Sequence, residues 1–144
     1  MVMKVKEVIN MTILNAIIER ADNNYSAYLE GLDGVVSVGD TLEEIKENLS
    51  KALDVYIEAS EEMGCKVPAF LKGEYEIRFS MDVKSLLEYY EGIFTKAGLE
   101  RLTGINQKQL WHYVKGISRP RRSQVEKIEK ALHRLGAELS SISL

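Results

Sequence analysis

The stretch NQKQLWHYVKG at residues 106–116 gathers amide, lysine, tryptophan and histidine side chains on a short helical pattern. Leu110 and Tyr113 lie one three-residue step apart, which predicts a buried side with Val114 beside it and leaves the polar side chains outside. Amides and lysines near the start of an exposed helix can hydrogen-bond to base edges in a DNA major groove. We therefore predict DNA contacts from the outward residues of this helix: Gln107, Lys108, Trp111, His112 and Lys115.

A second short helix pattern comes just before this one, and signals for a tight turn separate the two. Thr95 can cap a helix that carries Leu99 inward, and residues 103–105, TGI, end it. Asn106 can cap the following helix, with Gln109 at the spacing of a capping box. This order of cap, short helix, glycine turn and cap predicts a helix-turn-helix.

A basic loop, ISRPRRS at residues 117–123, follows that helix. Its arginines, Arg119, Arg121 and Arg122, flank Pro120 and are suited to holding backbone phosphates without reading sequence. The alternative is a basic loop that only faces water.

Ser123 and Glu126 have capping-box spacing and predict the start of a last helix. Its apolar positions recur in 3-4 steps, which indicates a core-facing stripe that can also extend into a dimer contact. His133 lies off this stripe and is expected at the surface. The stripe consists of Val125, Ile128, Leu132, Leu135 and Leu139.

The first part of the chain has the pattern of a small sheet with one helix. Short β-branched and aromatic runs between turn residues predict strands at 12–20, 25–29 and 35–38, with Asp22 to Asn24 as a hairpin turn. Alternation over residues 75–79 predicts a fourth strand. The first ten residues are ambiguous, so we assign them no element.

Between the third and fourth strands the apolar period changes from two to about 3.6. Thr41 and Glu44 have capping-box spacing, and Gly64 marks the end of the helix. The predicted sheet-facing side consists of Leu42, Ile45, Leu49, Ala52, Leu53, Tyr56 and Met63. The predicted water-facing residues are Glu43, Glu47, Asp54, Glu58 and Glu61. The predicted fold class is thus α+β, a β-β-β-α-β domain over residues 1–80 followed by an all-α helix-turn-helix domain over residues 81–144.

Charge divides along the same boundary. Residues 1–80 carry 8 Lys+Arg and 15 Asp+Glu, a balance of −7, while residues 81–144 carry 11 and 7, a balance of +4. Within residues 95–134 there are 10 basic and 3 acidic side chains. Such a local positive field attracts a polyanion even though the whole chain is acidic, although a solvated basic face has the same composition.

The sequence offers little for catalysis, so we expect no enzyme, metal or cofactor. Asp22, Asp33 and Asp40 fall at turns, where aspartate is favoured for local hydrogen bonds, whereas two-metal hydrolysis needs converging carboxylates. Cys65 is the only cysteine, and we interpret it as a small packing residue. The apolar run at 11–18 is far shorter than the roughly 20 residues of a membrane helix. We therefore expect a cytoplasmic protein without a membrane segment.

Two stretches of the sequence carry a family resemblance. Residues 95–136 resemble the helix-turn-helix of phage-repressor (Xre-like) type, and residues 17–44, IIERADNNYSAYLEGLDGVVSVGDTLEE, are similar to the N-terminal signature of HicB antitoxins. In this order they resemble a HicB-type antitoxin with a C-terminal DNA-binding domain. The resemblance implies a truncated ribonuclease H-like N-terminal domain without an active site, which binds HicA, a small basic RNA-cleaving toxin. It also implies that the C-terminal domain binds operator DNA.

Carried over residue by residue, the repressor pattern assigns base contacts to Gln107, Lys108 and His112 and the cap to Asn106. Glu100 stands where the pattern usually has a small residue, and Gly98 lies inside the first helix, at a cost of roughly 1 kcal/mol relative to alanine. The angle at which the two helices cross is thus left open.

A single helix-turn-helix seldom binds tightly alone, so we expect at least a homodimer that reads two half-sites. Two other functions remain open at this stage. One is a stand-alone transcription regulator whose N-terminal domain senses a small molecule, and the other is a degenerate nuclease.

Overall fold

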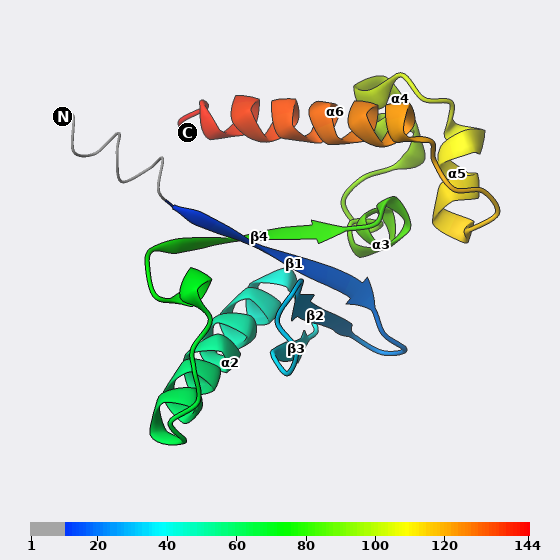
Figure 1. Cartoon of the computed structure of the whole chain (residues 1–144). Coiled ribbons are helices and arrows are strands. Elements are labelled where there is room, and N and C mark those ends of the chain that lie inside the picture. The colour runs from blue at the N-terminus through cyan, green and yellow to red at the C-terminus, as the bar shows by residue number, and fades with distance from the viewer. Residues whose placement is uncertain (1–10) are drawn as a thin grey trace. The chain divides into compact units, whose positions relative to one another are not determined.

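The computed structural model describes residues 11–144 (Figure 1). The first ten residues lie outside the described part. The chain divides into two compact units, Met1–Met81 and Asp82–Leu144, each described by itself below. The first unit combines the sheet with one long helix, and the second unit contains helices alone, which confirms the predicted α+β class.

The N-terminal unit contains a four-stranded sheet in the order β3-β2-β1-β4. β1 pairs antiparallel with β2 and parallel with β4, while β2 pairs antiparallel with β3. All four predicted strands are present, the third beginning one residue later than expected. Their bounds are β1 Thr12–Arg20, β2 Tyr25–Leu29, β3 Val36–Gly39 and β4 Tyr75–Met81.

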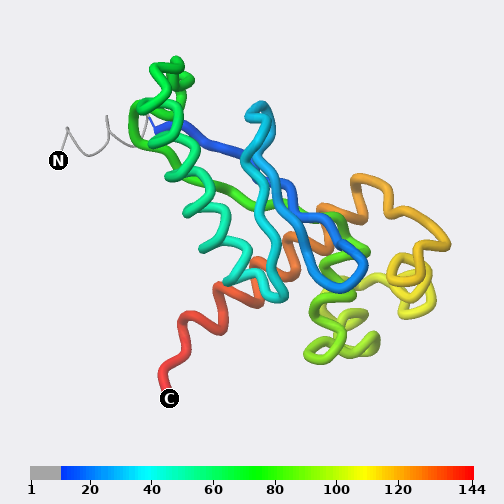
Figure 2. Tube along the Cα trace, turned by 90° about the horizontal axis from the view of Figure 1, so that it is seen from below, coloured from blue at the N-terminus to red at the C-terminus, as the bar shows by residue number. Residues whose placement is uncertain are grey.

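Helix α2, Leu42–Glu62, connects β3 to β4 by way of a short 3-10 turn, η1 at Ala69–Leu71. It lies along one face of the sheet (Figure 2). Ile45, Leu49 and Leu53 are fully buried there, because their four-residue spacing keeps them on one side of the helix. β1 presents alternate residues to the same core, Leu14, Ala16 and Ile18, as the two-residue period of a strand requires.

The predicted cap of α2 forms with one difference. The Glu44 amide donates to Thr41 Oγ1 at 3.1 Å, and the Glu44 carboxylate accepts from the amide of Asp40 at 2.9 Å. The carboxylate was expected to reach the amide of Thr41 itself. The carboxylate thus binds the residue before the cap. Hydrogen bonds therefore fix the chain at both Asp40 and Thr41, where it turns from β3 into α2.

Two predictions at the end of α2 are wrong. Met63 is 77% exposed and does not continue the sheet-facing side. Cys65 is exposed and does not belong to the core. The left-handed Gly64 turns the chain away from the helix, and the Cys65 amide closes the helix end on the Ser60 carbonyl at 2.8 Å. Val67 and Leu71 are the buried residues of this connection.

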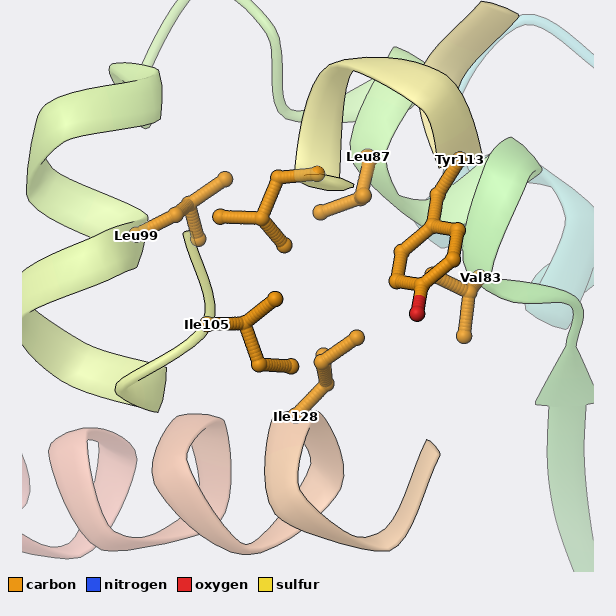
Figure 3. Packing of buried hydrophobic residues seen from close by; sticks show 7 residues of the cluster. Val83, Leu87, Leu99, Ile105, Tyr113 and Ile128 are labelled. Carbon is orange, nitrogen blue, oxygen red and sulfur yellow. The ribbon is translucent and has the colours of Figure 1, made fainter. Parts of the chain in front are cut away.

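The C-terminal unit is all helical. Its side chains converge on one apolar cluster formed by Val83, Leu87, Leu99, Ile105, Leu110, Tyr113 and Ile128 (Figure 3). Every helix contributes to it, as does the turn between the second and third. The helices are α3 Val83–Tyr89, α4 Lys96–Thr103, α5 Gln107–Lys115 and α6 Arg122–Ser140.

α6 differs from the prediction at both ends. It begins at Arg122 after Arg121 in the cap position, without a side-chain cap, so Ser123 and Glu126 form no capping box. Glu126 pairs instead with Arg122 at 3.3 Å. Leu139 is 59% exposed, because the C-terminal half of α6 extends past the other three helices (Figure 1).

No helix within residues 11–144 combines the length and apolar character that crossing a membrane requires.

Candidate nucleic-acid interface

The turn between α4 and α5 is held by its own residues. Gly104 ends α4 in the left-handed region at φ 74°, a conformation that costs glycine nothing. Ile105 then enters the core, 4% exposed. The buried Thr103 hydroxyl donates to the Leu99 carbonyl at 2.7 Å and accepts from the Ile105 amide at 3.1 Å. Because both ends of the turn are hydrogen-bonded or buried, α5 leaves α4 in one defined direction.

α5 has one buried side and one outer side, as the sequence predicts. Leu110 is fully buried and Tyr113 is 4% exposed. Asn106 caps the helix, its Oδ1 accepting from the Lys108 amide at 2.8 Å. Gln107, Lys108 and Lys115 are exposed, so their side chains are available to a ligand.

Trp111 and His112 occupy the middle of this outer side. Trp111 is 37% exposed, and the Lys96 ammonium of α4 lies 5.9 Å from the centre of its ring. A cation over an indole face is a stabilising arrangement, so Lys96 and Trp111 form a basic aromatic surface that joins α4 to α5. His112 is half-buried and stacks at a tilt against Trp111, with ring centres 5.7 Å apart. It is less available than the sequence suggested.

The end of α5 positions the basic loop. Gly116 takes φ 71°, and the Ile117 amide donates to the His112 carbonyl at 2.9 Å. Gln109 was expected to complete the cap of α5, but its amide donates to Ser118 Oγ at 3.2 Å and ties the helix to the loop that follows. Arg119 and Arg121 are exposed beyond this tie.

Arg122 does not lie in the loop, where the sequence placed it. It is the first residue of α6, and its side chain, 93% exposed, pairs with Glu126. An ion pair at this exposure contributes little to stability, so the guanidinium can exchange Glu126 for a phosphate at small cost.

The other cations of this surface have no acidic partner within residues 11–144. Among the described residues of the C-terminal unit, ion pairs form only between Lys84 and Glu88 and between Arg122 and Glu126. No carboxylate of the described residues therefore pairs with the exposed cations Lys108, Lys115, Arg119 and Arg121. Unpaired cations on an exposed helix and the loop after it can bind phosphates, while the amide of Gln107 can bind a base edge.

We define the α5 surface as the outer side of α5, its cap and the loop after it. It unites all the residues predicted from the sequence, with Arg122 on the adjoining turn of α6: Asn106, Gln107, Lys108, Trp111, His112, Lys115, Arg119, Arg121 and Arg122. Among the described residues, no group of three or more His, Cys, Asp or Glu side chains could hold a metal ion.

Three residues that shape this surface were not anticipated. Lys96 faces Trp111 across the turn, Thr103 holds the turn from inside, and Ser118 anchors Gln109. The Thr103 hydrogen bond could have been recognised, since a threonine before a helix-ending glycine can hydrogen-bond back to the preceding turn. The other two contacts depend on packing between elements.

Comparison with known proteins finds one partial relative. The chain is 38% identical over 45 residues to a UPF0150 protein of Helicobacter pylori (strain J99), a stretch that covers 31% of this chain and 62% of that protein. The match thus spans less than two thirds of that relative's length. No protein-family model matches the chain, and no solved structure matches it either.

Proposed function

We propose that this chain is a DNA-binding antitoxin of HicB type. Its C-terminal unit would repress its own operon, and its N-terminal unit would neutralise a small, basic, RNA-cleaving toxin. The observation that carries the proposal is the α5 surface, with amide and lysine side chains exposed on a helix that is held by a turn of defined geometry. The protein would act in the cytoplasm, where both DNA and toxin are found.

DNA binding accounts for features that the stability of the unit does not require. Lys108, Arg119 and Arg121 are exposed and unpaired by carboxylates among the described residues, so they add repulsion to the folded unit without compensation. A duplex would supply the missing negative charge. In a major-groove complex the N-terminal turn of the recognition helix faces the bases, and here that turn carries Gln107 and Lys108.

Toxin binding is supported by the charge of the N-terminal unit. The outer side of α2 places Glu43, Glu47, Asp54 and Glu58 in solvent, as the sequence predicts. A surface of one sign accelerates encounter with a partner of the opposite sign. The partial relationship to the UPF0150 protein does not specify a partner, so this half of the proposal rests on charge and on the resemblance of residues 17–44 to HicB antitoxins.

The test is co-expression with the gene next to this one. We expect that gene to encode a small basic protein that arrests growth alone, and we expect this chain to restore growth and to co-purify with it. Footprinting on the upstream DNA with purified chain should show a protected site, and Lys108→Ala should weaken that protection without affecting growth rescue. Failure to rescue growth and to bind the upstream DNA would refute the proposal.

One observation favours a second candidate, a stand-alone regulator that senses a small molecule. An open hollow of about 740 Å³ lies at the C-terminal end of α2, lined among others by Ile57, Val67 and Leu71. Its walls combine apolar side chains with Lys66 and Lys72. A regulator of this kind would bind operator DNA but would neither protect cells from the neighbouring gene nor co-purify with its product.

A further inference from the structure

The face of the sheet opposite α2 carries an apolar row. Ile17 of β1 pairs with Tyr28 of β2, and Tyr28 pairs with Val36 of β3, so the three side chains lie side by side on this face. Val36 is 58% exposed and Tyr28 is 38% exposed, while the residues on the α2 side of the same strands are buried. Val38, also exposed, extends the row along β3. We call Ile17, Tyr28, Val36 and Val38 the open-face row.

Carboxylates border this row. The Tyr28 hydroxyl donates to Glu19 Oε1 at 3.5 Å, and Glu19 belongs to the same face because it pairs across the sheet with Ser26, the neighbour of Val38. Desolvation, Glu19 and then Glu30 raise the pKa of Tyr28. Glu30 follows β2 two residues after Tyr28, and its amide donates to the Asn15 carbonyl of β1 at 2.9 Å, so it continues the alternation of β2 on the same face. The open-face row therefore combines apolar surface with an acidic border.

A partner can meet this region on the face or along the outer edge of β3. At the edge, the Val38 carbonyl already accepts from the Asn48 side-chain amide at 2.9 Å. An added strand would have to displace that bond, whereas a partner lying on the face would meet only side chains. The geometry favours packing on the face.

We infer that the open-face row is the docking surface for the toxin, a basic polypeptide that covers Tyr28 and Val36 with apolar side chains and sets lysines or arginines against Glu19 and Glu30. This inference rests on the proposed function and adds the face used. An exposed row of β-branched and aromatic residues with a charged border is typical of a protein contact. The border of the row is acidic and the proposed toxin is basic, so their charges attract each other, whereas a second copy of this acidic unit would be repelled. Charge therefore favours the toxin as the occupant of this face.

The matched test compares Val36→Lys with Val55→Lys, using the co-purified product of the neighbouring gene. Val55 lies on α2 and is 63% exposed, so both variants add the same charged group at similar exposure on different surfaces. We expect Val36→Lys to raise the Kd for the toxin roughly 30-fold, as for a central contact residue, and Val55→Lys to change it less than about twofold. Operator binding should be unchanged in both.

A second pair of variants tests the same face without relying on Val36→Lys. Glu19→Lys and Glu62→Lys make the same change of charge, on the open face and at the last residue of α2 respectively. Glu19→Lys should slow association with the toxin about 10-fold at low salt, and Glu62→Lys should slow it less. Circular dichroism and urea unfolding identify any variant that has lost its fold.

The outcomes are distinguishable. Equal loss in both members of each pair, or no loss in Val36→Lys and Glu19→Lys, overturns the open-face assignment but leaves the antitoxin function standing. A Val36→Lys variant that loses self-association and keeps its toxin affinity shows that a second copy occupies the face, which also overturns it. A wild-type chain that does not bind the toxin removes the proposed function and this inference together.

Discussion

Lys108 and Arg121 are both exposed and cationic, but their positions suit different tasks. Lys108 lies in the first turn of α5, where a recognition helix meets base edges, while Arg121 lies in the loop before α6. Contacts to bases discriminate between sequences, whereas contacts to phosphates strengthen binding to every sequence alike. The two side chains should therefore respond differently to substitution.

We predict that Lys108→Ala and Gln107→Ala each cost about 1 to 3 kcal/mol on the operator and much less on random DNA. Arg121→Ala should weaken binding to both DNAs alike and lower the salt slope by about one. Fluorescence anisotropy with operator and scrambled duplexes at several salt concentrations measures both effects. Lys130→Ala on the exposed side of α6 is the control for loss of one positive charge. Equal losses on both DNAs for all variants would contradict base reading by α5.

At the scale of elements, the turn between α4 and α5 depends on a backbone conformation and one buried side chain. Local signals predicted it well: the Thr95 cap, the glycine at 104 and the Asn106 cap are all present. These signals succeed because a cap or a left-handed glycine involves atoms only a few residues apart. The capping box proposed at Ser123 failed, since Arg121 and Arg122 begin the helix earlier and Glu126 turns to Arg122.

Gly104→Ala should destabilise the C-terminal unit by about 1 to 2 kcal/mol, because its φ of 74° strains any residue with a Cβ. The added methyl group itself would meet no atom within 4 Å, so the cost is one of backbone conformation alone. Trp111 is the only tryptophan, so urea unfolding followed by its fluorescence reports on this unit.

Gly92→Ala is the matched control. A Cβ at Gly92 also meets nothing within 4 Å, and its φ lies outside the left-handed region, so the substitution should be neutral or slightly stabilising. If Gly104→Ala and Gly92→Ala shift the urea midpoint equally, the turn does not depend on its left-handed glycine.

At the scale of the whole molecule, the two units differ in charge and in the partner each suits. The exposed acidic side of α2 and the open-face row belong to one unit, and the α5 surface belongs to the other. A single α5 covers too little DNA for tight binding, so we expect two copies of the chain to bind one operator. The exposed Leu139 at the far end of α6 offers apolar surface for such a pairing.

A dimer of this kind reads half-sites about 34 to 36 Å apart, one turn of the duplex. Inserting about 5 base pairs between the half-sites rotates one of them to the opposite side of the DNA, so affinity should fall to that of a single half-site. Inserting about 10 base pairs restores the facing and should restore part of the affinity. Sedimentation and anisotropy measure stoichiometry and affinity for each spacing. An affinity independent of spacing would mean that each copy binds alone.

The sequence by itself determined the order of the four strands and of α2, α4, α5 and α6, the buried side of α5 and the residues exposed on it. These depend on periodicity and on caps, which act over a few residues. Only the tertiary structure decided that β4 joins β1 in parallel, that Gln109 holds Ser118 and that Lys96 faces Trp111. It also showed Met63, Cys65 and Leu139 in solvent. Such contacts join residues that are far apart in the sequence, or they depend on where a packed surface ends. No local sequence pattern shows where a helix extends beyond the elements that pack against it.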